Sequence, residues 1–582
     1  MSPLLAQATT SQAAPAASTL RQLSESTQPW VEYSLYYFTP ELVLLGGFLL
    51  TIIVDLFVRR ANASRLITGV LAFLVIGVSV FLSAYEYIPH SPKWEGGKLI
   101  FTYSQTLFGP MTDAQGAVSV PYGMLVVDNL AVFFKILIGT AGALVILMSL
   151  ASREVKVNGD RAGEYFALII ASCFGMYLMP ASLDLVMMYI SLEMVSIAGY
   201  IMAGFNKGTI RSSEAALKYI LYGATSSGLM LFGFSYLYGM TGTTNIIAIR
   251  QILDMQMVDP AFAANNIALW VALVLSLAGM GYKIGAVPFH FWAPDVYEGA
   301  PTPVTAFLSV ASKAAGFGLL MRFLFFTFPM NVQTGDPIVD WPTVLAVISA
   351  ITMTLGNLTA LQQTNVKRLL AYSSIAHVGY ILMGLVVAGA QVGSFGISRG
   401  KGDEGVVAIL IYLVAYLFMN LGAFYVVQLL ANRVGSEELE DYRGLGRRAP
   451  MLSTGLAIFI VSLIGLPLTV GFIGKLYLFS AVLTQPEWLW LAVIAIVNTI
   501  LAVYYYLRVL IAMYMRDKTT EVTIGDHDEA ELLLTADGKL AYSWPARLLL
   551  FVFLIPTIVL GVYFGPLLEF TQNAIRFFSL PK

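Results

Sequence analysis

Long apolar windows recur along almost the whole chain, separated by shorter polar segments. Each window has about 20 residues, the length at which an α-helix crosses a hydrocarbon layer. In that layer a segment must satisfy its backbone hydrogen bonds internally, so each window is expected to be helical. The pattern predicts an all-α polytopic membrane protein of about 14 transmembrane helices, at residues 39–58, 66–84, 126–150, 162–180, 184–205, 213–240, 266–297, 302–328, 338–362, 366–388, 404–431, 452–482, 488–515 and 544–569.

Two of the windows, 266–297 and 452–482, are too long for one straight helix and contain glycine and proline near the middle. Proline removes a backbone donor and clashes with the preceding turn. A long span interrupted in this way is typical of a discontinuous helix that lines a cavity. An ordinary proline kink is the alternative. The residues expected to form the breaks are Gly285 and Pro288 in the first window, and Pro467 and Gly471 in the second.

The two interrupted windows are the seventh and the twelfth in the chain. Their spacing predicts two five-helix repeats, at residues 162–328 and 338–515, with the broken helices 7 and 12 in equivalent positions. Because each repeat has an odd number of spans, the second must be inverted in the membrane, which is an architecture of transporters. Residues 31–161 then supply helices 1–3, and residues 516–582 supply a polar loop and helix 14.

The loops and the chain ends predict an orientation. Residues 1–30 are rich in Ala, Ser, Thr and Gln and lack the apolar core of a signal peptide, so they are predicted to be a disordered tail. If the N-terminus lies outside, the inner loops contain clearly more Lys and Arg than the outer ones, as the positive-inside rule requires. The chain is therefore expected to be a multi-pass protein of a bacterial inner membrane, with both termini on the periplasmic side.

Composition narrows the possible functions. The chain is 58% hydrophobic and 12% charged with a net charge of −2, so nucleic acid is not an expected partner. A single cysteine, Cys173, excludes a disulfide framework or an iron–sulfur cluster held by this chain alone. The four histidines are too scattered to argue for haem. We expect no cofactor in this chain.

Ionisable residues near the centre of a span are costly and need a reason. A buried lysine that exchanges an acidic partner for an apolar wall can take up and release protons, so such residues predict a proton relay. A structural Glu193–Lys218 ion pair, snorkelling of Lys218 and simple packing of His377 are the alternatives. The candidates are Glu193, Lys218, Lys283, Lys313, His377 and Lys475.

Lys283 and Lys475 are the hardest of these to explain by packing, because each stands beside a predicted break, where backbone carbonyls are freed. Glu193 and Lys218 lie on adjacent spans and are expected to be coupled. Arg322 lies near the end of its span, where its long side chain is expected to snorkel to the interface. Asp128 begins a span and is expected to cap that helix.

Three segments carry a resemblance to a known family. Residues 283–304, which contain the first break, resemble the broken-helix motif of the antiporter-like membrane subunits of complex I. Residues 365–380, around His377, and residues 465–475, around the second break, resemble two further signatures of that family. The resemblance covers roughly residues 120–515. Fourteen spans and a lysine at position 475 fit the N-type members, whereas M-type members place an acid there.

The resemblance implies a function for the whole assembly. Electrons would pass in a separate hydrophilic arm from NAD(P)H to a quinone, with the Fe–S clusters, flavin and quinone in other subunits. This chain would move protons, and its partners would be other membrane-arm subunits of complex I and the lipid bilayer. Glu193 would modulate Lys218, and protons would pass from Lys283 and Lys313 by way of His377 to Lys475. Stand-alone multisubunit Na+/H+ antiporters share these motifs and are the alternative.

Overall fold

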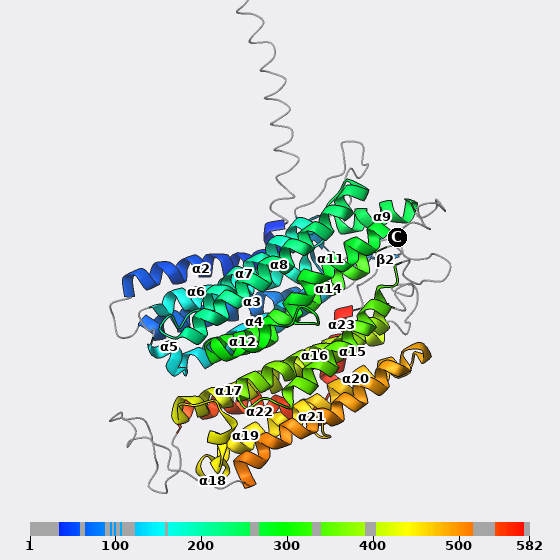
Figure 1. The fold of residues 1–582 in the computed structure, drawn as a ribbon. Helices are drawn as coiled ribbons and strands as arrows, with labels where there is room; N and C mark the ends of the chain where they lie inside the picture. The colour runs from blue at the N-terminus through cyan, green and yellow to red at the C-terminus, as the bar shows by residue number, and fades with distance from the viewer. Residues whose placement is uncertain are drawn as a thin grey trace, which may run out of the picture.

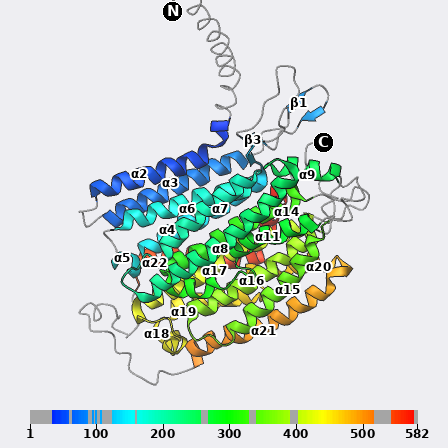
Figure 2. The same ribbon diagram turned by 45° about the horizontal axis from the view of Figure 1, so that its top comes forward.

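The structure is a computed structural model, which describes residues 34–58, 64–87, 93–95, 98–100, 105–107, 123–157, 161–256, 267–328, 339–389, 403–515 and 542–575. The predicted tail 1–30 and most of the polar loop after residue 515 lie outside the described residues. The helices run alongside one another in a single bundle (Figure 1). Figure 2 shows α2 and α3 at one edge of this bundle and α21 at the opposite edge.

In the described ranges, thirteen helices are long and apolar enough to cross a membrane. The two shorter helices α19 (Pro450–Ile464) and α20 (Val470–Leu483) together make a fourteenth span. The prediction of about fourteen spans is therefore confirmed. The long helices are α2 (Thr39–Val58), α3 (Ser64–Tyr87), α4 (Asn129–Leu150), α6 (Ala162–Ala181), α7 (Leu185–Ala203), α8 (Ile210–Thr241), α11 (Ile267–Ile284), α13–η2–α14 (Thr302–Phe307, Leu308–Ser312 and Lys313–Thr327), α15 (Trp341–Ala360), α16 (Val366–Gly389), α17 (Asp403–Val434), α21 (Leu489–Met515) and α22 (Trp544–Val562).

The remaining elements are short. The helical ones are α5 (Arg153–Val157), α9 (Ile246–Gln256), α12 (Trp292–Gly299), η4 (Leu439–Tyr442), α18 (Leu445–Arg448), η5 (Pro486–Trp488) and α23 (Gly565–Ile575). Two antiparallel strand pairs join β1 (Lys93–Glu95) to β2 (Lys98–Ile100) and β3 (Gln105–Leu107) to β4 (Leu125–Val127). The window expected at 544–569 is divided between α22 and α23 by the two non-helical residues Tyr563 and Phe564.

Both predicted breaks are present. α11 ends at Ile284, and Gly285 follows with φ +78°, a left-handed conformation that favours glycine. α19 ends at Ile464, and Gly465 follows with φ +88°. Chain direction therefore changes at Gly285 and Pro288 in the first break and at Gly465 to Pro467 in the second. The inverted relation of the two repeats stays a prediction.

Gly471 has a different role from the one expected for it. It lies inside α20 rather than in the turn. A Cβ at Gly471 would stand 1.8 Å from the Ser462 carbonyl oxygen, so only glycine allows α20 to approach α19 this closely. The Gly471 N–H donates to Ser462 Oγ at 3.1 Å, which joins the two halves of the broken span.

The span Thr302–Thr327 and helices α16 and α17 form the core of the bundle, since nearly all of their apolar length is covered by other helices. By contrast, α2, α8, α21 and α22 bury only a minority of theirs and present apolar side chains outwards. Helices in a hydrocarbon solvent need no polar outer face. The core helices and the outer helices therefore differ mainly in their position in the bundle. The core helices are the ones that contribute Lys313 and His377.

The position of Arg322 differs from the one expected from the sequence. Its side chain is 1% exposed and does not snorkel, because it lies on α14 within the core. Its guanidinium pairs with Asp128 and donates from Nε to the Pro180 carbonyl at 2.6 Å. Asp128 also accepts from the Ala131 N–H at 2.8 Å, which confirms it as the cap of α4. The pair joins α14 to α4 and α6.

Replacing Arg322 with methionine is expected to destabilise the protein by about 3–5 kcal/mol, because Asp128 would remain as an unpaired buried charge. Thermal unfolding in lipid nanodiscs measures the change. Arg211→Met is the control, since this arginine side chain is 75% exposed and a surface pair contributes at most about 1 kcal/mol. Equal shifts in the thermal unfolding of the two variants would show that the buried Arg322–Asp128 pair stabilises the protein no more than the exposed pair does.

Candidate functional site

The structure brings four of the six predicted residues into the interior of the bundle. Lys283, Lys313, His377 and Lys475 are between 1% and 5% exposed. They come from the end of α11, the start of α14, the middle of α16 and the first half of α20. Helices distant in sequence thus converge on one buried band of basic groups.

Lys283 and Lys313 lie on the two sides of the α11–α14 contact. Lys283 Nζ donates to Ser196 Oγ on α7 at 3.2 Å. Lys313 Nζ faces the first break, where a Cβ added to Gly285 would be 3.9 Å away. A Cβ at Gly316, one turn beyond Lys313, would be 3.5 Å from Lys283 Cγ. The small residues in both helices therefore let the two lysines share one contact.

Two hydroxyl groups continue from Lys313 toward the second repeat. Lys313 Nζ donates to Ser374 Oγ on α16, and Tyr416 Oη on α17 donates to the same oxygen at 2.7 Å. The Tyr297 ring lies 5.8 Å from the ammonium, at a distance typical of a cation–π contact. Lys313 therefore has polar and aromatic partners but no acidic one within ion-pair distance among the described residues.

His377 occupies the next position in this band. Its Nδ1 is 2.6 Å from Tyr412 Oη, and its Nε2 is 3.3 Å from Tyr506 Oη. The ring centroids of His377 and Tyr416 are 5.2 Å apart, which brings the imidazole beside the hydroxyl chain from Lys313. Imidazole nitrogens and phenol hydroxyls can each donate or accept. His377 therefore has a possible proton partner on both sides of its ring.

Lys475 lies against the second break. Its Nζ donates to the carbonyls of Leu463 at 3.3 Å and Ile464 at 2.7 Å, the last residues of α19. These carbonyls have no partner within their own helix and lie at its negative end. The expectation of freed carbonyls beside a break is thus confirmed for Lys475. Lys283, in contrast, is hydrogen-bonded to a serine hydroxyl.

Glu193 lies near Lys283. The two side chains interact electrostatically without forming a direct ion pair. Glu193 Oε1 is buried and has no hydrogen-bond partner in the part of the chain that the structure describes. A carboxylate in this position acts on Lys283 through space, and any reorientation of either side chain would change their interaction.

The expected coupling of Glu193 with Lys218 is wrong as a direct ion pair. Lys218 Nζ lies 2.6 Å from both Glu214, one turn earlier on α8, and Asp295 on α12. Its side chain is 36% exposed, so it is not a midspan charge without compensation. Helix α8 is 32 residues long, and its first turns extend beyond the apolar centre. Asp295 also binds Arg368 at 2.6 Å, which forms a separate charged cluster on α12.

Sequence reasoning missed the hydroxyl groups that connect the basic ones. Tyr412 and Tyr416 stand one turn apart on α17, and Ser374 precedes His377 by one turn on α16. This spacing places each pair on one face of its helix and was the available signal. A serine or tyrosine carries no net charge, so it can lie in a span without the cost that a lysine has there. Its presence in the sequence therefore does not by itself indicate a function.

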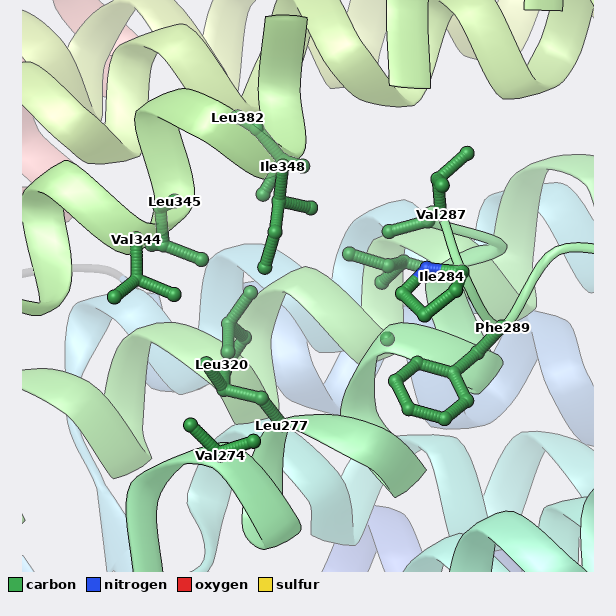
Figure 3. Close-up of a pocket in the computed structure, with 13 residues that line it drawn as sticks. Val274, Leu277, Ile284, Val287, Phe289, Leu320, Val344, Leu345, Ile348 and Leu382 are labelled. Atoms are coloured by element: carbon green, nitrogen blue, oxygen red, sulfur yellow. The ribbon is translucent and has the colours of Figure 1, made fainter. Parts of the chain in front are cut away.

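An apolar cavity of about 170 Å³ opens beside the first break. Figure 3 shows Ile284, Val287 and Phe289 of the break facing Val344 and Ile348 of α15 across it. No charged side chain lines the cavity, so it does not belong to the band of lysines. Within the described ranges, no group of three or more His, Cys, Asp or Glu is placed to hold a metal ion.

The chain is similar to known proteins both in sequence and in fold. The family described as NADH:quinone oxidoreductase/Mrp antiporter matches residues 182–502. NADH-quinone oxidoreductase subunit N 2 of Chloroherpeton thalassium is 44% identical over 93% of this chain and 94% of that protein. Subunit N of Chlorobium chlorochromatii is 42% identical over 94% of this chain and 96% of that protein.

Two solved structures have a similar fold. A chain of respiratory complex I from Thermus thermophilus superposes with a TM-score of 0.64 at 25% identity, covering 91% of this chain and 98% of that one. A chain of the Mrp complex from a Dietzia species superposes with a TM-score of 0.71 at 20% identity, covering 93% and 97%. The second likeness is one of fold alone.

A double-mutant cycle tests the partner of Lys218. Lys218→Met and Asp295→Asn are expected to show a coupling of about 0.2–1 kcal/mol, the range for partly exposed ion pairs. Lys218→Met and Glu193→Gln are expected to be additive. Thermal unfolding in nanodiscs measures all of the variants. If Lys218 coupled to Glu193 and not to Asp295, the pair predicted from the sequence would be correct.

Proposed function

The chain belongs to the subunit N family of NADH-quinone oxidoreductases, and we propose that it moves protons through Lys283, Lys313, His377 and Lys475. One observation carries the proposal: hydroxyl groups on α16 and α17 join Lys313 to the neighbourhood of His377 inside the most buried part of the bundle. Proton movement needs only groups that can donate and accept in turn, and this band supplies them without a substrate pocket.

The route begins at the α11–α14 contact. Lys283 and Lys313 share this contact, and Glu193 acts on Lys283 through space. We therefore assign Glu193 to Lys283 rather than to Lys218. When the carboxylate interaction weakens, the buried ammonium loses compensation and gives up a proton more readily. Lys313 receives charge on the far side of the contact.

From Lys313 the route crosses to the second repeat through Ser374 and Tyr416. Ser374 Oγ accepts from both Lys313 and Tyr416, so its own proton passes to Tyr416 only after the tyrosine hydroxyl turns to accept it. His377 then relays between Tyr412 and Tyr506. Lys475 ends the route at the second break, where carbonyls at the end of α19 stabilise its charged form.

The assembly supplies the energy for this movement. We propose that Fe–S clusters, flavin and quinone lie in other subunits and that this chain binds neighbouring membrane-arm subunits within the lipid bilayer. The relatives at 42% and 44% identity, which cover nearly the whole chain, favour this role over a stand-alone Na+/H+ antiporter. Purification from native membranes decides between them: copurifying hydrophilic subunits that reduce a quinone support the proposal, and their absence supports the antiporter.

We further propose that both termini face the periplasm. Lys and Arg are more abundant in the loops that this orientation places inside, and cytoplasmic loops are enriched in these residues. With this orientation the first span runs inward from its N-terminus.

Lys283→Arg and Lys475→Arg are each expected to keep the assembly intact and to abolish proton pumping. Arginine preserves the positive charge but stays protonated, so it cannot act in a relay. Quinone-reductase activity and proton uptake, both measured in reconstituted vesicles, report the two properties separately. Arg variants that pump at the wild-type rate would show that the two lysines are fixed charges. Arg211→Lys is the control, because it makes the reverse exchange, arginine to lysine, at an exposed site.

Tyr412→Phe is expected to lower the pumping rate by about fivefold to tenfold, which corresponds to the roughly 1 kcal/mol of one lost hydrogen bond. The matched control is Tyr425→Phe on the same helix, because that hydroxyl binds the Ala546 carbonyl away from the band. Proton uptake by vesicles is the measurement. If both variants lose pumping equally, the effect is one of helix packing and not of the His377 contact.

A further inference from the structure

A second set of buried charges lies in the first three spans, outside the band of lysines. Lys135 on α4 is completely buried. Its Nζ is 2.8 Å from Glu41 on α2 and 3.4 Å from Glu86 on α3. Glu41 is 2% exposed and the Glu86 side chain is 11% exposed. Each of the three helices thus contributes one charged group to a single contact.

The surroundings of this cluster are polar but contribute no further cation from the described residues. Ser79 Oγ donates to the Pro40 carbonyl at 2.9 Å, so this hydroxyl is already engaged. The Tyr177 phenol on α6 lies near enough to Glu41 to interact with it electrostatically. Tyr177 approaches α4 across Gly139, where a Cβ would be 2.3 Å from its hydroxyl oxygen. The titratable groups that face the cluster from α2, α3, α4 and α6 are therefore Glu41, Glu86, Lys135 and Tyr177, with Cys173 one turn along α6.

One buried carboxylate oxygen here is left without a hydrogen bond. Glu41 Oε2 is buried and has no partner among the residues that the structure describes. An ionised carboxylate in an apolar interior normally has each oxygen satisfied, because an unsatisfied one costs the desolvation of that group. A carboxyl group that carries a proton removes the charge and supplies a donor. Glu41 Oε1 is 2.8 Å from Lys135, whereas its Oε2 is left without compensation.

The charge balance of the cluster indicates one bound proton. Two carboxylates and one ammonium leave a net charge of −1 at a buried contact, which is a costly state. Two acids that share one site cannot both remain ionised cheaply, and one proton makes the cluster neutral. Because the groups interact strongly, the proton belongs to the pair and not to either residue.

We propose that Glu41 and Glu86, held together by Lys135, form a protonatable site that carries one proton at neutral pH. The site is separate from the relay and independent of the proposed function. Glu86 is the more exposed of the two acids and lies at the end of α3, so it is the group through which the site exchanges its proton with the surface. The ligand of the site is the proton and not a metal cation.

Infrared spectroscopy of the purified assembly at pH 7 tests the proposal, because protonated and ionised carboxyl groups absorb at different frequencies. One protonated-carboxyl signal per chain is expected to disappear in Glu41→Gln and equally in Glu86→Gln. Either variant leaves one carboxylate that Lys135 neutralises. In Lys135→Met the signal is expected to double, since both acids then become neutral. Glu214→Gln, which removes an exposed acid paired with Lys218, is the control and should leave the signal unchanged.

A labelling experiment on the unaltered protein covers the case in which a variant does not assemble. A hydrophobic carbodiimide reacts with protonated carboxyl groups, and mass spectrometry locates the product. Modification of Glu41 or Glu86 at pH 7 that declines as the pH rises supports the proposal. No modification of either residue overturns it in favour of a purely structural ion cluster. A signal that disappears when sodium replaces potassium also overturns it, since the occupant would then be a cation.

Discussion

A charge within the hydrocarbon layer must be compensated, and the arrangement of this bundle depends on that constraint. Bulk water is absent, so each ionic group needs a partner of opposite charge, a dipole or a polar neighbour. Arg322 meets the requirement with a capping aspartate and a proline carbonyl. Lys475 meets it with the carbonyls at the end of a broken helix. The positions of the charged residues therefore determine which helices must touch.

The compensation differs between structural and transport groups. Arg322 has a close carboxylate partner, which suits a fixed contact between helices. Lys313 and Lys475 have only hydroxyls, carbonyls and aromatic rings, whose attraction for an ammonium is weaker than that of a carboxylate. A group held by neutral dipoles can change its charge at a smaller cost than one held by an anion. The same principle separates the central band from the Lys218 cluster, where two acids hold the lysine.

Helix breaks provide dipoles without adding acids. An intact helix uses all its internal carbonyls, whereas a helix that ends inside the bundle leaves its last carbonyls available. Gly285 and Gly465 make these ends possible, because each adopts a left-handed conformation that costs other residues energy. Lys313 lies against the first of these turns and Lys475 against the second. The two breaks thus place Lys313 at one end of the band of hydroxyl and imidazole groups and Lys475 at the other end.

Local pattern was sufficient to predict the spans, the two breaks and four of the buried bases (Lys283, Lys313, His377 and Lys475), since hydropathy and proline act over a single helix. It did not reveal that Lys135 and Arg322 are buried or that Lys218 is partly exposed. The cap at Asp128 was predictable for the same reason. The partners of the charges were not, because Arg322 and Asp128 are 194 positions apart and Lys218 and Asp295 are 77 apart. Such pairs depend on how helices pack, and many packings share one hydropathy profile. The hydroxyl groups of Ser374 and Tyr416, and the Glu41–Lys135–Glu86 cluster, acquire meaning only when three-dimensional contacts bring separate helices to the same point.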